Sequence, residues 1–119
     1  MQINVSLQNR EYKYSLGDHL PQHTVFVHHC LLSDQQITWL NSAAGQRVTI
    51  TFGPGICPLV NADGTPWARN MATFPGKAAK VNPDFPRDRY YSLVKYTVTL
   101  PDDTSGTAPH DPEVIIVDG

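Results

Sequence analysis

Hydrophobic and polar residues alternate along several short stretches of the chain, and this period of two is the clearest pattern in the sequence. Alternation sends successive side chains to opposite faces, which is typical of a β-strand with one buried face. The alternating stretches lie at residues 3–7, 12–16, 25–30, 48–52 and 94–100. A continuous β-branched run at 114–117 predicts one more strand, covered on both faces.

Turn-forming residues separate these stretches, so the predicted strands are short. Short strands divided by Gly, Pro, Asn and Asp predict an all-β fold, an antiparallel β-sandwich. The 119 residues suffice for a single domain with its own core over residues 1–119. We expect this core to contain Trp39, Val48, Ile50, Phe52, Tyr96 and Val98.

Residues 53–90 interrupt the alternation and form a long Pro-rich excursion. The excursion holds six of the ten prolines, and we expect Trp67, Phe74 and Phe85 to anchor it over one end of the sandwich. Long irregular loops in compact domains are often binding surfaces. Two interpretations remain open, a surface for an anion or a partner and a solvated structural cover. The residues that would serve a partner are five of the nine basic residues, Arg69, Lys77, Lys80, Arg87 and Arg89.

Two parts of the chain resemble the centre and the end of cupredoxins. Ile37-Thr38-Trp39-Leu40-Asn41, followed by Arg47-Val48-Thr49-Ile50, resembles the family's V-T-W-x-N strand and its return to the sheet beside a copper-binding histidine. Tyr96-Thr97-Val98, the loop through His110 and the run at 114–117 resemble its late strand, loop and closing strand. The resemblance implies a Greek-key β-sandwich.

The copper ligands are where the chain departs from that family. Blue copper needs two imidazoles, a thiolate and usually a weak thioether. By the resemblance, the first histidine position falls on Arg47, the thiolate position on Val98 and the methionine position near Glu113. Only His110 corresponds to a ligand. The resemblance therefore implies a copper-free relative that carries no cofactor.

Residues 33–36 also fit a different local structure. Ser33-Asp34-Gln35-Gln36 has the form of a helix capping box, with Leu32 and Ile37 placed as a hydrophobic staple and Gly45 as a stop. The rival interpretation makes residues 36–41 a strand. The resemblance to cupredoxins favours the strand.

Four of the five histidines lie between positions 19 and 29, which raises a metal-binding alternative. His28 and Cys30 are two residues apart on a predicted strand, so they share a face, and His19 or His23 from the preceding loop would complete a mixed set of ligands. Zinc or Cu(I) suits such nitrogen and sulfur donors. In the structural alternative, His28 is a polar residue on a sheet face and Cys30 a small core residue.

The two cysteines, Cys30 and Cys57, leave two alternatives open. They form either one disulfide, which requires an oxidising compartment, or two buried free thiols. The first residues contain neither a basic n-region nor an apolar h-region. This predicts a cytoplasmic protein by default, and a periplasmic or secreted one if a leader has been removed.

The net charge and the absence of catalytic motifs narrow the range of possible functions. A formal net charge of −2 gives no long-range attraction for nucleic acid, and no apolar run reaches the ~18 residues of a membrane helix. No nucleophile elbow or phosphate-binding loop is present, so we expect no enzyme. Residues 102–118 hold five acids and no Lys or Arg, a weak indication of self-association with the basic excursion. The sequence thus predicts a non-catalytic module for protein interaction or self-assembly.

Overall fold

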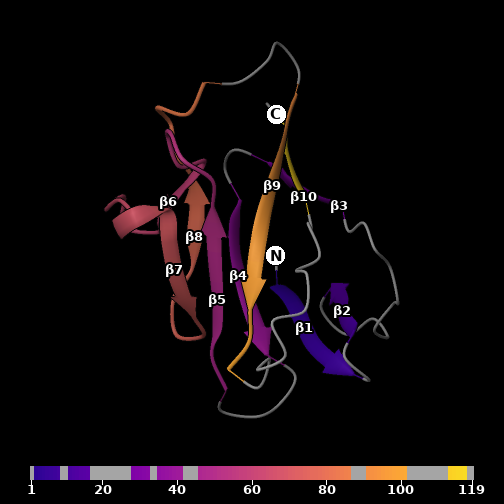
Figure 1. Cartoon of the computed structure of the whole chain (residues 1–119). Helices are drawn as coiled ribbons and strands as arrows, with labels where there is room; N and C mark the ends of the chain where they lie inside the picture. The colour runs from indigo at the N-terminus through magenta and orange to yellow at the C-terminus, as the bar shows by residue number, and fades with distance from the viewer. Residues whose placement is uncertain are drawn as a thin grey trace.

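The computed structural model describes residues 2–8, 11–16, 28–32, 35–41, 46–86, 91–101 and 113–117. Most of the regular structure in these ranges is β-strand, as the alternation predicts (Figure 1). The strands are β1 (Gln2–Gln8), β2 (Glu11–Leu16), β3 (His28–Leu32), β4 (Gln36–Asn41), β5 (Val48–Phe52), β6 (Leu59–Asn61), β7 (Met71–Phe74), β8 (Ala79–Val81), β9 (Tyr91–Thr99) and β10 (Glu113–Val117). A short 3-10 turn, η1 (Ala68–Asn70), precedes β7. Within these residues, no helix has the length and apolar character needed to cross a membrane.

The described strands form two five-stranded sheets that pack on each other in a sandwich-like arrangement. Their strand orders are β2-β1-β4-β8-β6 and β3-β10-β9-β5-β7. Most neighbouring strands are antiparallel, but β1 pairs with β4 and β10 pairs with β3 in parallel. The predicted antiparallel β-sandwich is therefore confirmed as an all-β arrangement of two sheets, but each sheet also contains one parallel pair, so both sheets are mixed. Alternation shows which side chains share a face but carries no information on the direction of a distant neighbour.

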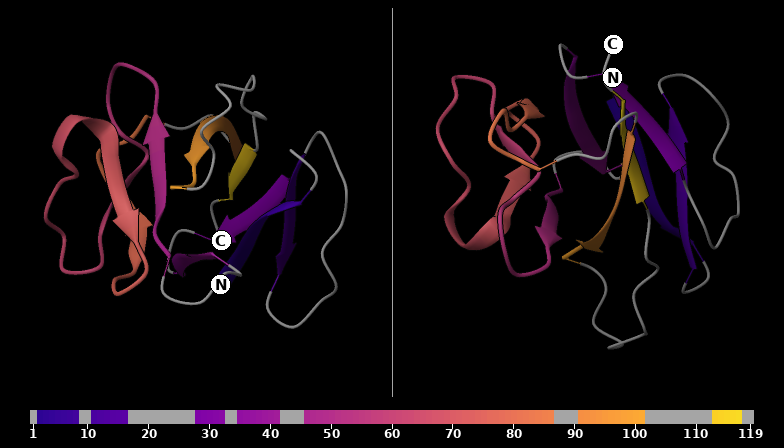
Figure 2. Two further views of the ribbon diagram at one scale, coloured as in Figure 1. Left: turned by 60° about the horizontal axis from the view of Figure 1, so that its bottom comes forward. Right: turned by 90° about the horizontal axis from the view of Figure 1, so that it is seen from above.

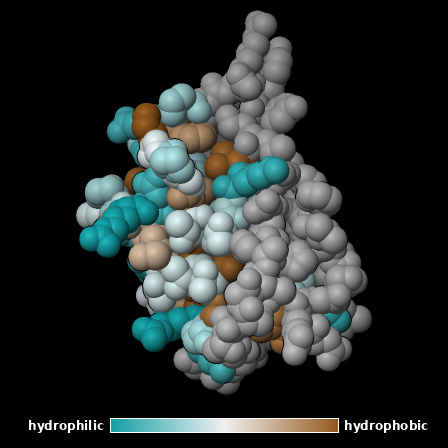
Figure 3. All heavy atoms as spheres, viewed as in Figure 1, coloured by the Kyte–Doolittle hydropathy of each residue, from teal (hydrophilic) through white to brown (hydrophobic). Residues whose placement is uncertain are grey.

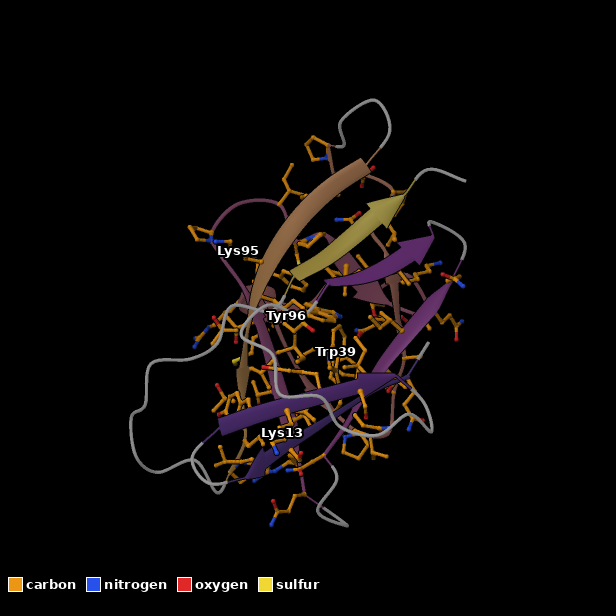
Figure 4. The ribbon with its side chains drawn as sticks, turned by 90° about the vertical axis from the view of Figure 1, so that its right-hand side faces the viewer. Lys13, Trp39, Lys95 and Tyr96 are labelled. Carbon is orange, nitrogen blue, oxygen red and sulfur yellow. The ribbon has the colours of Figure 1, made fainter. Side chains whose placement is uncertain are left out.

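The predicted core is confirmed. Trp39, Val48, Ile50, Phe52, Tyr96 and Val98 are all buried. Trp39 lies between the sheets, with its ring centroid 5.0 Å from that of Phe74 and 5.5 Å from that of Tyr96. Its indole Nε1 donates a hydrogen bond of 3.3 Å to the Tyr96 hydroxyl. Figure 4 shows both rings in the space between the sheets, whereas Lys95, the neighbour of Tyr96, lies outside.

Residues 36–41 form strand β4, so the strand interpretation is confirmed and the helix interpretation is wrong. β4 lies at the centre of its sheet, where Ile3 pairs with Trp39 on one side and Ala79 with Ile37 on the other. Ile37, Trp39 and Asn41 are buried, so the inward positions follow the period of two.

The excursion is more regular than its sequence predicts. It contains β6, β7 and β8, which extend the two sheets at one end of the molecule, and the turn η1 (Figure 2). The expectation of a long irregular segment is wrong because strands of three or four residues are too short for alternation to stand out. Its expected anchors are confirmed, since Trp67 and Phe74 are buried and Phe85 packs partly buried against the core.

Candidate interaction surface

The excursion ends each sheet with a different kind of edge strand. β6 is the last strand of one sheet and β7 the last strand of the other. The outer side of β6 is covered by the segment that follows it, since Val60 forms a bridge with Pro66 and the Asn61 N–H donates to the Thr65 carbonyl at 2.9 Å. Leu59 and Val60 are both buried. β6 therefore has no open edge at these residues.

A turn at residues 61–65 holds this cover in place. The Asp63 carboxylate accepts hydrogen bonds from the Thr65 hydroxyl at 2.6 Å and from the Thr65 N–H at 2.9 Å. These two bonds lower the pKa of Asp63, and the charge of Lys80 lowers it further. The charged carboxylate is thus the form that fits the turn.

Two residues with an uncommon backbone conformation precede β7. Arg69 and Asn70 have φ angles of 57° and 55°, in the left-handed region. Asn tolerates this region better than Arg because its short amide bonds locally. The Asn70 Nδ2 donates to the Gly53 carbonyl at 2.8 Å and to the Gly55 carbonyl at 3.0 Å. Asn70 thereby fastens the 53–57 loop to the start of β7.

This fastening brings two exposed apolar side chains to the same end of β7. Ile56 follows Gly55 and is 55% exposed, and Met71 follows Asn70 and is 46% exposed. Thr73, the next outward residue of β7, is also exposed. We define the β7 surface as Ile56, Arg69, Met71, Thr73 and Lys77. Around it, the face over β5 and β7 is mostly pale, weakly hydrophilic side chains in Figure 3.

The structure separates the basic residues that the sequence assigns to a partner. Arg69 is exposed just before β7, and Lys77 is exposed just after it, with its Nζ 5.8 Å from the Phe74 ring centroid. Lys80 lies on β8 of the other sheet, where it lines a hollow of about 300 Å³ together with Asp84. Arg87 and Arg89 lie outside the described residues. Only Arg69 and Lys77 of the described three flank one strand.

The metal-binding hypothesis stays a prediction. His28 and Cys30 lie on β3, where His28 is in register with Glu113 of β10, and the structure describes their backbone only. His19 and His23 lie outside the described residues. Among the side chains that the structure does describe, no group of three or more His, Cys, Asp and Glu could hold a metal ion.

Cys57 precedes β6, is partly buried and forms no disulfide with any other side chain that the structure describes. Burial raises its pKa, which keeps the thiol protonated at neutral pH. Cys30, its partner in the disulfide alternative, lies on β3, which ends its sheet at the side opposite β7. The Cys30 side chain is not among those described, so the choice between a disulfide and two thiols stays a prediction.

Sequence reasoning did not single out Ile56, Asn70 or Met71. Apolar residues in a loop and at a strand end are expected to be buried, and exposure becomes visible only once the sheets are assembled. The asparagine at position 70 was the available signal, since Asn is enriched at left-handed positions.

Comparison with protein-family models, with curated proteins and with solved structures gives no match to this chain. The functional proposals therefore rest on the β7 surface and on the residues of β4 and β5.

Proposed function

We propose that this protein is a non-catalytic, copper-free module that binds a protein partner, or a second copy of itself, through its excursion. The observation that carries the proposal is the β7 surface. Two of the three exposed large apolar side chains among the described residues, Ile56 and Met71, gather there beside an edge strand. Exposed apolar side chains at a strand edge favour association with another chain.

The proposal includes a cupredoxin-like Greek-key arrangement of the two sheets. It is supported by the motif at residues 37–41, which lies in the central strand β4 with Trp39 in the core. The family's ligand positions support the copper-free assignment. Arg47 is an exposed cation before β5, and Val98 is an apolar side chain that is 1% exposed. Neither side chain is a ligand for a soft metal.

A panned peptide library tests the proposal. Random peptides displayed on phage are selected on the immobilised protein, and the affinity of the selected peptides is measured in solution. We expect Met71→Ser to weaken their binding about tenfold, since one buried apolar contact is lost. The matched control is Leu40→Ser, because Leu40 is also exposed, at 38%, but lies on β4 of the other sheet.

Two outcomes would contradict the proposal. One is the absence of any selected peptide combined with a monomer in solution at all concentrations. The other is equal loss of binding in Met71→Ser and Leu40→Ser, which would show that the β7 surface has no special role.

The alternative function, a zinc or copper protein that uses the cluster from His19 to Cys30, separates from the module by native mass spectrometry. The protein is purified without chelator, and its native mass is compared with its denatured mass. The module is expected to carry no stoichiometric metal. One bound zinc or copper that is lost in His28→Ala would favour the alternative and count against the module.

A further inference from the structure

We infer that β7 accepts an extended, acidic segment of a partner protein as an additional strand of its sheet. This inference rests on the proposed function and names the kind of partner that the β7 surface takes. Addition of a strand to a sheet edge is a recurring mode of peptide recognition, in which backbone hydrogen bonds supply affinity and side chains supply specificity.

The backbone of β7 presents the groups that such a strand needs. Val48 pairs with Phe74, and because Pro75 has no N–H, this pair can only be of the hydrogen-bonded type. The two types alternate along an antiparallel ladder, so the backbone groups of Met71 and Thr73 point away from β5. The Met71 N–H donates back to the Ala68 carbonyl, in agreement with this assignment. Thr73 is thus left with an outward N–H and an outward carbonyl.

Within residues 46–86, the neighbouring edge at β6 differs from β7 in this respect. The segment after β6 returns along β6 and forms the bridge between Val60 and Pro66. No such return segment lies along β7 within residues 46–86, where β5 is the strand that pairs with it. Within residues 46–86, the excursion therefore covers the edge of β6 and leaves the outer edge of β7 without a paired segment.

The charges beside β7 indicate an acidic occupant. Arg69 precedes the strand and Lys77 follows it, and among the described residues neither cation forms an ion pair. A second copy is disfavoured, because antiparallel pairing of two β7 strands would place Arg69 of one copy near Lys77 of the other. Parallel pairing would place each cation near its own equivalent. Like charges across a strand pair are destabilising, whereas carboxylates at both ends of an added strand are favoured.

The apolar side chains indicate the centre of the same segment. Met71 lies between Arg69 and Lys77 in the chain. Ile56 follows Gly55, whose carbonyl accepts a hydrogen bond from Asn70 beside Met71. A β-branched or aliphatic side chain on the added strand would cover Met71 and remove apolar surface from water. The inferred partner segment is therefore extended, apolar or β-branched in the middle and acidic at its ends.

The test uses a blocked peptide of alternating valine and threonine with glutamates at both ends. Its affinity for the full chain is measured by isothermal titration calorimetry, and amide hydrogen exchange is followed by NMR. We expect the Thr73 amide to exchange more slowly in the complex. Thr73→Pro removes the outward N–H and leaves the bonds to β5 in place, so we expect binding to weaken at least about tenfold.

Controls separate backbone pairing, charge and loss of fold. The same peptide with N-methylated central amides tests backbone pairing on the unaltered protein and is expected to bind at least about tenfold more weakly. The lysine-ended peptide is expected to bind more weakly than the glutamate-ended one. Lys77→Glu is expected to weaken binding of the glutamate-ended peptide, whereas Lys95→Glu, an exposed cation on β9, is expected to leave it unchanged.

Each adverse result has a distinct meaning. Equal binding of the N-methylated peptide, or equal binding of the lysine-ended peptide, would overturn strand addition by an acidic segment. Library peptides that depend on Met71 but tolerate Thr73→Pro would overturn this inference and leave the proposed function intact. A dimer that forms in solution and is lost in Thr73→Pro would identify a second copy as the occupant and would also overturn it.

Discussion

β6 and β7 end the two sheets at the same side of the molecule, but their outer edges differ. β6 is covered by its own return segment, through the Val60–Pro66 bridge and the bond from Asn61 to Thr65. β7 carries exposed Met71 and Thr73 and ends its sheet. An open edge is a liability for aggregation, and flanking cations such as Arg69 and Lys77 reduce that risk. The excursion thus covers the edge of β6 with its own hydrogen-bonded return segment, whereas the edge of β7 is flanked by two cations.

Both edge strands pack on one hydrophobic core, and a substitution of Trp39 tests that core. The Trp39 ring contacts Phe74 of β7 and Tyr96 of β9. We expect Trp39→Ala to lower the free energy of unfolding by about 3–5 kcal/mol, because a large buried ring leaves a cavity. Trp39→Phe leaves a smaller cavity, so it is expected to cost less than the alanine variant although it also loses the bond to Tyr96. A loss below about 1 kcal/mol in the alanine variant, measured by urea denaturation, would contradict the packing described.

Hydrogen exchange compares the two edges directly in the free protein. The Asn61 amide bonds to the Thr65 carbonyl, whereas the Thr73 amide points away from β5. We expect the Thr73 amide to exchange at least about tenfold faster than the Asn61 amide at neutral pH. NMR detection after dilution into deuterated water gives both rates from one sample. Equal protection of the two amides would mean that β7 is covered as well as β6.

The cover of β6 is expected to loosen in acid. The folded pKa of Asp63 lies below its ordinary value of 3.8, so ionisation stabilises the folded turn. This stabilisation is present above about pH 4 and is lost as the pH falls through the lower folded pKa. Denaturation curves between pH 5 and pH 2 should therefore show a smaller pH dependence for Asp63→Asn than for the unaltered protein. An unchanged pH dependence of the free energy of unfolding would mean that the Asp63 carboxylate does not stabilise the turn.

Cys57 lies just before β6, the covered edge, and the reactivity of its thiol gives the smallest of the expected effects. Burial raises the pKa of its thiol, so we expect slow reaction with a thiol reagent at neutral pH and faster reaction as the pH rises. Cys57→Ser provides the matched control that assigns the reacting group. The total thiol content in denaturant without reductant decides between the two cysteine alternatives, since a disulfide would leave none.

The sequence predicts the centre of the fold better than its ends. β5 buries Val48, Ile50 and Phe52 and exposes the residues between them more, so its period of two is readable. β6 and β8 have three residues each, which is too few for a pattern. The parallel pairing of β1 with β4 depends on contacts between segments far apart in the chain. Local sequence does not encode such pairing in a readable form.

The candidate surface was predictable only in part. The charge count located Arg69 and Lys77 in the excursion, and both flank β7. Lys80 comes from the same count but lies on the other sheet, near Asp63. The role of Asn70 depends on two carbonyls more than ten residues away, at Gly53 and Gly55. A contact of that kind becomes visible only when the loop and the strand are seen together.

The left-handed pair before β7 has a consequence for directed evolution. Glycine adopts the φ of 57° found at Arg69 without steric cost, so Arg69→Gly is expected to be stabilising by up to about 1 kcal/mol. Asn70 differs, because its amide holds the 53–57 loop. A library selected for heat resistance should therefore replace Arg69 and retain Asn70, whereas one selected for capture of an acidic peptide should retain both. If the two selections differ only at position 69, the Arg69 charge lowers the stability of the fold and is kept for binding the acidic peptide.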